Sequence, residues 1–233
     1  MAAEAEAVAV QKVKRQDETK DRVWREVVSW FWVIVAFLLI EGTLVQARVI
    51  PSGSMENTVL IGDHLIVSRI GYDAGIPFTN VHVPLWRNPK RQQIIVFRAP
   101  LPQEGNPDFI KRVIGLPGDT LEIKAGVVYV DGKALVEPYR EEPPNPNEFR
   151  GPWKVPAGEY FMMGDNRENS YDSRYWGFVP RENIIGTPVM IYMSIDAPEE
   201  VWDPGHVGER FATYLSVFIH PREVRWKRLF HTF

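Results

Sequence analysis

The sequence predicts a mostly β protein that is preceded by one transmembrane helix near its amino terminus. Residues 24–45 are rich in Trp, Val, Ile, Phe and Leu, and 22 helical residues at about 1.5 Å each would cross a hydrocarbon core of about 30 Å. After residue 46 the apolar residues occur in short runs of β-branched and aromatic side chains. Gly, Pro or Asp bounds these runs, as is typical of strands.

Composition limits the classes of function. The chain has 233 residues and 45% hydrophobic content, which is enough for one sizeable core. A net charge of -3 and the lack of a nucleic-acid motif predict no binding to nucleic acid. The chain has no cysteine, which excludes thiol nucleophiles and disulfides. Its five histidines are scattered without paired ligand spacing, so we expect no metal and no cofactor.

The amino-terminal segment divides into a charged tail, residues 1–23, and the predicted transmembrane helix, residues 24–46. Six basic residues precede the apolar stretch, whereas Arg48 is the only basic residue in 47–66. The positive-inside rule therefore predicts a cytoplasmic tail, as a frayed helix or a disordered segment, with the rest of the chain outside. Two alternatives stay open: a buried amphipathic helix and a cleavable secretory signal.

Residues 47–233 are predicted to form an extracytoplasmic β domain, in which about 120–155 make a small β-hairpin subdomain with a Pro-rich loop. The hairpin is predicted because Asp131-Gly132, between two short apolar runs, suits a type I′ turn. Prolines at 143, 144 and 146 indicate an exposed loop. The predicted strands are 63–67, 93–97, 109–114, 120–123, 127–130 and 188–192.

The carboxyl-terminal segment combines helical spacing with aromatic and basic residues. Two interpretations are open: core packing with a solvated end, or an aromatic and basic surface that rests on lipid headgroups. The residues concerned are Phe211, Tyr214, Leu215 and Phe218, followed by Trp226 and Phe230.

Ser54 is the first candidate functional residue, because it follows Pro51-Ser52-Gly53 shortly after the predicted membrane exit. Taken alone, these residues favour a simple turn. A serine hydroxyl becomes a nucleophile only when a base lies within hydrogen-bond reach. The function of Ser54 therefore depends on a second residue.

Lys111 is the candidate base. In a strand over 109–114 its side chain shares a face with Phe109 and Val113. Burial between apolar neighbours disfavours the ammonium form and lowers the pKa of lysine, which produces a general base near neutral pH. The alternative is a lysine that reaches solvent from an edge strand. Arg112 is excluded because its guanidinium stays protonated.

Residues 164–174 form the third candidate segment, which is strongly polar. Read as a solvated loop, its ion pairs would contribute only about 0–1 kcal/mol each. Apolar residues on both sides, 160–163 and 175–180, indicate instead a loop that is held against the core.

Together these segments resemble the bacterial-type type I signal peptidases. The segments that carry the resemblance are Pro51-Ser52-Gly53-Ser54-Met55, residues 110–119 and residues 164–174. The resemblance extends from the anchor to about Ser194 and implies a signal-peptidase-like β-sheet catalytic domain. It also implies a membrane-bound serine endopeptidase that removes amino-terminal signal peptides from secreted or membrane precursors at small-x-small sites.

The resemblance also implies roles for individual residues. Ser54 would be the nucleophile and Lys111 the base, and Ser52 would form the oxyanion hole with the Ser54 backbone N–H. Ser170 would orient the lysine amine, while Asp172 and Arg174 would brace the site. The residues that would shape shallow substrate pockets are Ile50, Pro51, Met55, Val59, Phe109 and Ile110. An extended substrate would add a strand to a sheet edge.

The sequence departs from the family pattern at several positions. Glu56-Asn57 stands where the family usually has x-Pro, and Gln92-Gln93 stands where Gly-Asp is commoner. Glu168 and Tyr171 replace Asp and a small residue. Glu56 would disfavour a neutral lysine if it were close. None of these departures removes a proposed catalytic group.

Two other classes of protein stay open from the sequence. One is a soluble self-cleaving repressor or related processing protease with a serine and lysine dyad, which the predicted anchor disfavours. The other is an inactive, membrane-tethered binding module with the same β fold. Retention of Ser54, Lys111 and Ser170 together disfavours this second class.

Overall fold

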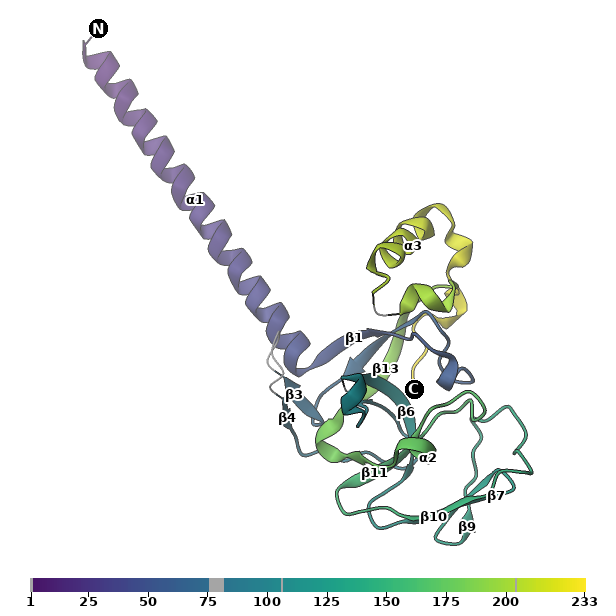
Figure 1. Ribbon diagram of the computed structural model, residues 1–233. Helices are drawn as coiled ribbons and strands as arrows, with labels where there is room; N and C mark the ends of the chain where they lie inside the picture. Colours follow the sequence, from purple (N-terminus) through teal and green to yellow (C-terminus); the bar gives the residue numbers. More distant parts are fainter. Residues whose placement is uncertain (1, 76–81, 106, 204) are drawn as a thin grey trace.

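The computed structural model describes residues 2–75, 82–105, 107–203 and 205–233, and within the first helix it describes the side chains from residue 20 onward except that of residue 42. One long helix, α1 (Ala2–Thr43), extends away from a body that is built mostly of strands (Figure 1). This arrangement confirms the predicted fold class.

The main sheet has seven strands with antiparallel neighbours. Each of the three segments that resemble a protease begins in one of these strands or follows one. Strand β1 follows α1 directly and pairs with β2, while β6 pairs with β5 and β11. In sheet order the strands are β1 (Val45–Val49), β2 (Asp63–Ser68), β13 (Ile184–Ser194), β5 (Ile94–Arg98), β6 (Asp108–Gly115), β11 (Glu159–Met163) and β12 (Val179–Pro180).

A second sheet of four strands forms the predicted hairpin subdomain, in the order β10 (Arg150–Lys154), β7 (Thr120–Lys124), β8 (Val127–Val130) and β9 (Lys133–Ala134). Asp131 and Gly132 have φ of 49° and 76°, so the predicted turn with two positive φ values is confirmed. Strands β3 (Asp73–Gly75) and β4 (His82–Pro84) form a small separate ribbon.

The apolar residues of these strands form three buried clusters, which hold the site segments from beneath. One cluster lies under β1 and the turn after it, and it includes Met55, Val59 and Leu65. A second includes Val113 of β6 with Phe97 of β5. The third, which includes Ile114, Leu121 and Phe161, joins the main sheet to the hairpin subdomain.

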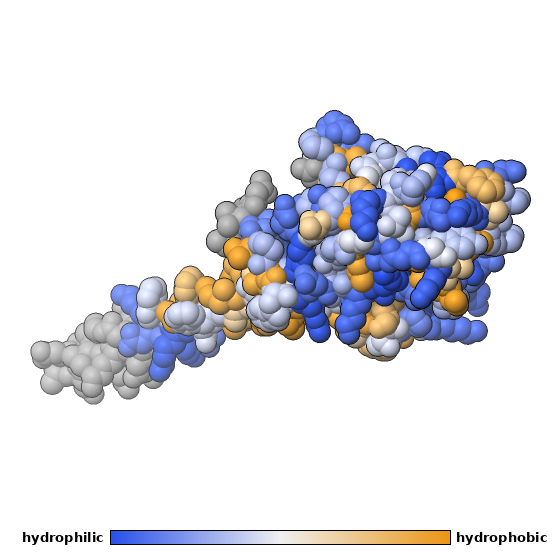
Figure 2. Space-filling model, turned by 90° about the horizontal axis from the view of Figure 1, so that it is seen from below, coloured by the Kyte–Doolittle hydropathy of each residue, from blue (hydrophilic) through white to orange (hydrophobic). Residues whose placement is uncertain are grey.

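Helix α1 begins at Ala2, so the predicted tail is helical from there on, which was one of its two predicted alternatives. The helix ends at Thr43 rather than at 46. The earlier end follows from sheet pairing, because Val45 already pairs with Ser68. Residues 20–41 have a mean hydropathy of 1.9 and none is buried, which contradicts the buried-helix alternative. Figure 2 shows this apolar band between the charged part of α1 and the body.

The carboxyl-terminal helix, α3 (Val207–Ile219), forms where helical spacing predicted it, but its apolar residues are not core residues. Phe211, Leu215 and Phe218 are 63%, 52% and 85% exposed. Tyr214 alone of the four predicted residues turns inward, where its hydroxyl lies 2.8 Å from His64 Nε2. Core packing is therefore wrong for the other three.

Candidate active site

Ser54 lies in a short 3-10 turn, η1 (Gly53–Met55), that follows β1. The chain before it is fixed to the start of β2, because Ile50 N donates to Asp63 O and Gly62 N to Ile50 O. Met55 is fully buried and anchors the turn in the core. Ser54 itself is 6% exposed, so its hydroxyl is held largely away from water.

Lys111 lies in the middle of β6, where it faces Ser54. Its Nζ lies 2.5 Å from Ser54 Oγ, although the two residues are 57 positions apart. The side chain is 4% exposed, and Nζ lies 5.2 Å from the centroid of the Phe109 ring. The strand thus buries Lys111, and the alternative of a solvent-reaching lysine is wrong.

The environment of Lys111 makes the neutral amine available at mildly alkaline pH. Burial lowers the pKa of Lys111 to about 8, while the carboxylates of Asp172 and Asp165 oppose this shift. Glu56 is exposed, and the two carboxylates that raise the pKa come from the third segment instead. A lysine with this pKa can accept a proton from a neighbouring hydroxyl.

The third segment is held against the core, as its flanking residues predicted. Asp172 is fully buried and accepts hydrogen bonds from Ser170 Oγ at 2.7 Å, from Gly164 N at 3.1 Å and from Arg174 Nε at 2.9 Å. Ser170 therefore donates its hydroxyl hydrogen to Asp172. The same carboxylate raises the pKa of Lys111.

Gly164 brings the third segment into contact with the nucleophile turn. A Cβ at this position would overlap Ser170 Oγ and the Ser54 carbonyl oxygen. Asn166 strengthens the same contact, because its backbone N–H donates to Ser54 O at 3.2 Å and its side chain donates to Gly53 O at 3.2 Å. Only glycine permits this approach.

A second ion pair lies beside the dyad, and the sequence analysis did not identify it. Arg112 donates to Asp165 through Nε at 2.7 Å and Nη2 at 2.6 Å, and Asp165 is fully buried. Thr58 Oγ1 donates to the same carboxylate at 2.5 Å. This network joins the chain just after Ser54 to the Lys111 strand and to the third segment. The sequence has several carboxylates and no local signal that pairs Arg112 with Asp165.

A groove of about 990 Å³ opens above Ser54 and Lys111. Residues 48–54, 107–111 and 168–171 line it, together with Leu65, Val96, Tyr175, Glu199, Trp202, Asp203 and Arg210. Arg48 Nη2 and Asp108 Oδ2 form an ion pair at 2.5 Å across it, which the sequence analysis also missed. Of the predicted site residues, those that line the groove are Ile50, Pro51, Ser52, Ser54, Phe109, Ile110, Lys111 and Ser170.

Four predicted site residues lie outside the groove lining. Met55 and Val59 are fully buried in the cluster beneath the groove, so the structure gives them no surface for a substrate. Asp172 and Arg174 lie behind Ser170. Ser52 is exposed at the groove, and its side chain makes no capping hydrogen bond to the turn.

Two departures from the expected pattern have structural explanations. Gln92 has φ of 65°, which is the left-handed conformation that favours the glycine expected at this position. Asn57 Nδ2 donates to Glu142 Oε2 at 3.0 Å and to Asp165 O at 3.4 Å. The Asn57 side chain therefore ties down the backbone where a proline ring was expected.

Comparison with known proteins assigns the chain to one family. The family described as "Signal peptidase, peptidase S26" matches residues 23–193. "Probable signal peptidase I-2" of Synechocystis sp. is 41% identical over 74% of this chain and 75% of that protein. "Signal peptidase I" of Leptolyngbya laminosa is 41% identical over 73% of this chain and 80% of that protein.

Among solved structures, a signal peptidase I from Enterococcus faecalis is 34% identical over 43% of this chain and 97% of that chain, with a TM-score of 0.37. The family assignment therefore rests on the sequence matches. These matches do not support the soluble repressor or the binding module. The chain belongs to the signal peptidase family, peptidase S26, and is a serine endopeptidase.

Proposed function

We propose that this protein cleaves amino-terminal signal peptides from precursor proteins with Ser54 as nucleophile and Lys111 as general base. The observation that carries the proposal is the 2.5 Å separation of Lys111 Nζ from Ser54 Oγ in a buried setting. The family assignment supplies the substrate class, because its members are named for the removal of signal peptides. No cofactor takes part in the proposed reaction.

The proposed reaction has two halves. The neutral amine of Lys111 takes the Ser54 proton as Oγ attacks the scissile carbonyl carbon, and the resulting ammonium then protonates the leaving amine. This gives an acyl-enzyme on Ser54. Lys111 next takes a proton from water, whose oxygen attacks the ester, and it returns the proton to Ser54 as the signal peptide leaves.

The oxyanion would be stabilised by donors beside the nucleophile. The Ser54 backbone N–H is one proposed donor, and the Ser52 hydroxyl, which is exposed at the groove, is the other. Loss of one oxyanion donor typically costs about a hundredfold to a thousandfold in kcat.

The substrate would lie extended in the groove between residues 48–54 and 108–111. Ile50, Pro51, Phe109 and Ile110 would form shallow apolar pockets that accept small side chains at the first and third positions before the cleaved bond. Such pockets would select small-x-small sites, since larger side chains would not fit.

We further propose that residues 20–41 anchor the protein in the cell membrane with a cytoplasmic amino terminus. The absence of natural cysteines permits a clean test with single cysteines. An impermeant maleimide applied to spheroplasts should label a Glu141→Cys variant and not a Lys14→Cys variant. The reverse pattern would refute the orientation.

Contact with membrane lipid is proposed for the carboxyl-terminal segment as well as for α1. Phe211, Leu215 and Phe218 form an exposed apolar stripe on α3, and Trp226 is 61% exposed beside basic residues. This is the composition of a surface that rests on lipid headgroups. Vesicle flotation of a protein that lacks α1 would test this contact separately from anchoring.

The test of the proposed function uses a secretory precursor with an Ala-x-Ala site and the full-length protein in detergent. Wild type should release the mature protein, and Ser54→Ala should not, because it lacks the nucleophile. Unchanged cleavage by Ser54→Ala would refute the proposal.

A further inference from the structure

The loop that joins β9 to β10, residues 135–149, contacts all the segments that carry the active site. It belongs to the hairpin subdomain, and within the described residues none of it lines the groove. Its contacts are therefore with the segments that hold Ser54 and Lys111, and it does not contact the space where a substrate would lie.

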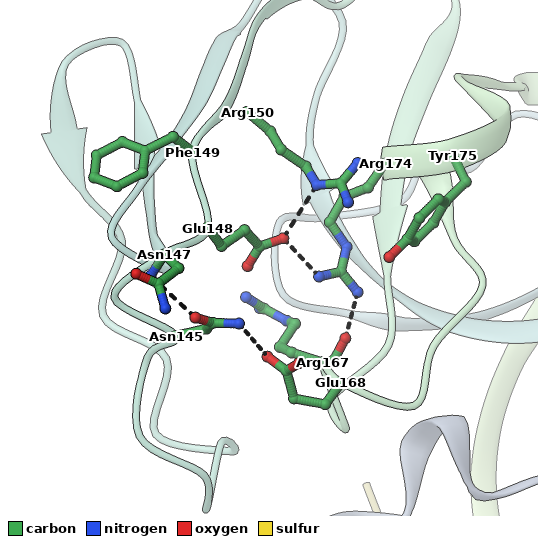
Figure 3. A pocket seen from close by; sticks show the side chains of 9 residues that line it. All are labelled: Asn145, Asn147, Glu148, Phe149, Arg150, Arg167, Glu168, Arg174 and Tyr175. Atoms are coloured by element: carbon green, nitrogen blue, oxygen red, sulfur yellow. Dashed lines mark hydrogen bonds and ion pairs between the residues drawn. The ribbon is translucent and has the colours of Figure 1, made fainter.

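Glu148 connects this loop to the third segment. Arg174 Nη1 donates to Glu148 Oε1 at 2.9 Å, and the two side chains are 2% and 13% exposed. Figure 3 shows the Glu148 carboxylate between the guanidinium groups of Arg150 and Arg174, beside a polar cavity of about 360 Å³. Since Arg174 also donates to Asp172, Glu148 is linked to the carboxylate that holds Ser170.

Glu137 makes a second connection to the same segment. Arg167 Nη2 donates to Glu137, and both side chains are buried. Arg167 Nε donates in addition to Gly164 O at 3.0 Å. Gly164 is the residue that packs against the Ser54 carbonyl, so this connection also ends at the nucleophile turn.

Glu142 connects the loop to the nucleophile segment itself. It accepts the hydrogen bond from Asn57 Nδ2, and the same amide group reaches the carbonyl of Asp165. Asn57 lies three residues after Ser54, at the position where the family usually has a proline. The backbone of this turn therefore lacks the restraint that a proline ring would give. By accepting the hydrogen bond from Asn57, Glu142 thus restrains a turn that has no proline at position 57.

Tyr139 and Val136 complete the contacts at the strand that carries the base. The guanidinium carbon of Arg112 lies 3.9 Å from the centroid of the Tyr139 ring, a cation–π contact. Gln92 Nε2 donates to Val136 O at 2.6 Å, and Arg112 Nη1 donates to Gln92 O at 2.7 Å. The residue next to Lys111 is therefore held by the loop as well.

We propose that the 135–149 loop is a clamp that holds the Ser54 turn, the Lys111 strand and the 164–174 segment in one arrangement, with Glu142 and Glu148 as positioning residues. This inference rests on the proposed function of Ser54 and Lys111. The dyad needs such a restraint because Ser54 and Lys111 come from separate segments. A displacement of one reacting group by about 1 Å can lower the rate of the chemical step about a hundredfold.

The first test replaces one glutamate at a time in the full-length enzyme. Glu142→Ala and Glu148→Ala should each lower kcat about tenfold or more, because the dyad is displaced, whereas KM should change by about twofold or less, because the loop itself lines no part of the groove. Glu141→Ala is the matched control, since Glu141 is exposed in the same loop and makes no hydrogen bond or ion pair within the described residues. Its kcat should equal that of wild type.

The second test asks whether Glu142 acts through Asn57. A proline at 57 fixes φ near −65° and restrains the turn without Glu142. In an Asn57→Pro background, Glu142→Ala should have no further effect on kcat, whereas Glu148→Ala should keep its full effect. Full additivity of Glu142→Ala with Asn57→Pro would refute this link.

The outcomes separate the clamp from the proposed function. If Glu142→Ala and Glu148→Ala lower only the thermal midpoint and leave kcat at the level of Glu141→Ala, the loop is merely structural and the clamp is wrong. A rise in KM without a fall in kcat would also contradict it. Failure of the proposed function would appear instead as residual cleavage by Ser54→Ala.

Discussion

Lys111 Nζ lies 2.5 Å from Ser54 Oγ inside the protein, and the two residues reach each other from β6 and from the turn after β1. The fold brings them together, because residues 48–54 and 107–111 line the same groove. Burial lowers the pKa of the lysine and so favours the uncharged form that the proposed general base requires.

The rate of cleavage should depend on pH through Lys111. Its pKa is lowered to about 8, so below pH 8 the amine is mostly protonated and unable to act as a base. We expect kcat/KM to rise about tenfold per pH unit below pH 8 and to level off above it. Steady-state kinetics on a precursor peptide from pH 6 to pH 10 would show this. A rate that stays constant over that range would contradict the role of Lys111.

The same pKa predicts a pH dependence of stability. The pKa of Lys111 is about 8 in the folded state and near the ordinary lysine value of 10.5 in the unfolded chain, so the unfolded state binds more protons between these values. The free energy of unfolding should therefore rise with pH across pH 8–10.5, by about 3 kcal/mol in total.

A Lys111→Met variant isolates this effect from other titrating groups. It should be more stable than wild type at pH 7, because it removes a buried group that is charged there. The difference in free energy of unfolding should shrink as the pH rises to 10.5, which denaturant titrations at several pH values would measure. An unchanged difference would show that Lys111 is not the buried lysine of low pKa.

Gly164→Ala should disrupt the contact between the third segment and the nucleophile turn. The new Cβ would overlap the Ser54 carbonyl, which is backbone, so the turn itself must shift. We expect a fall in kcat of about a hundredfold, together with a loss of about 1–3 kcal/mol in stability. Gly208→Ala is the control, because a Cβ there meets no atom within 4 Å. Equal activity of the two variants would refute the contact.

The ion pair between Arg48 and Asp108 should affect substrate binding more than chemistry. The side chains are 33% and 29% exposed, so the interaction free energy of the pair is at most about 1 kcal/mol. If all of it affects substrate binding, KM changes by about fivefold. Arg48→Ala and Asp108→Ala should each raise KM by up to that factor and leave kcat unchanged. Their effects should not add in the double variant. Additive effects, or a fall in kcat, would show that the two residues act separately.

The sequence predicted the parts of the site that have local signals. Apolar alternation around Lys111 predicted its strand and left its burial as one of two alternatives, and Asp131-Gly132 predicted the hairpin. Helical spacing predicted α3 but left open whether Phe211 and Phe218 pack in the core or lie on the surface, because periodicity reports a helix face and not what covers it.

Contacts between distant segments could not be predicted in this way. The role of Ser170 in orienting the lysine amine was expected, but its hydrogen bond to the buried Asp172, two residues away, was not. Glu142 and Glu148 come from a Pro-rich loop that read as solvated, and their partners depend on where the hairpin subdomain packs. Such pairings depend on the tertiary arrangement rather than on local pattern.

In the proposed mechanism, an uncharged Lys111 takes the proton of Ser54. The most direct measurement is kcat/KM of Lys111→Met at pH 8 with an Ala-x-Ala precursor, because methionine keeps the volume and the burial but accepts no proton. The account predicts a loss of at least about a thousandfold, with a folded protein of normal or raised thermal midpoint. Cleavage within about tenfold of wild type would contradict it.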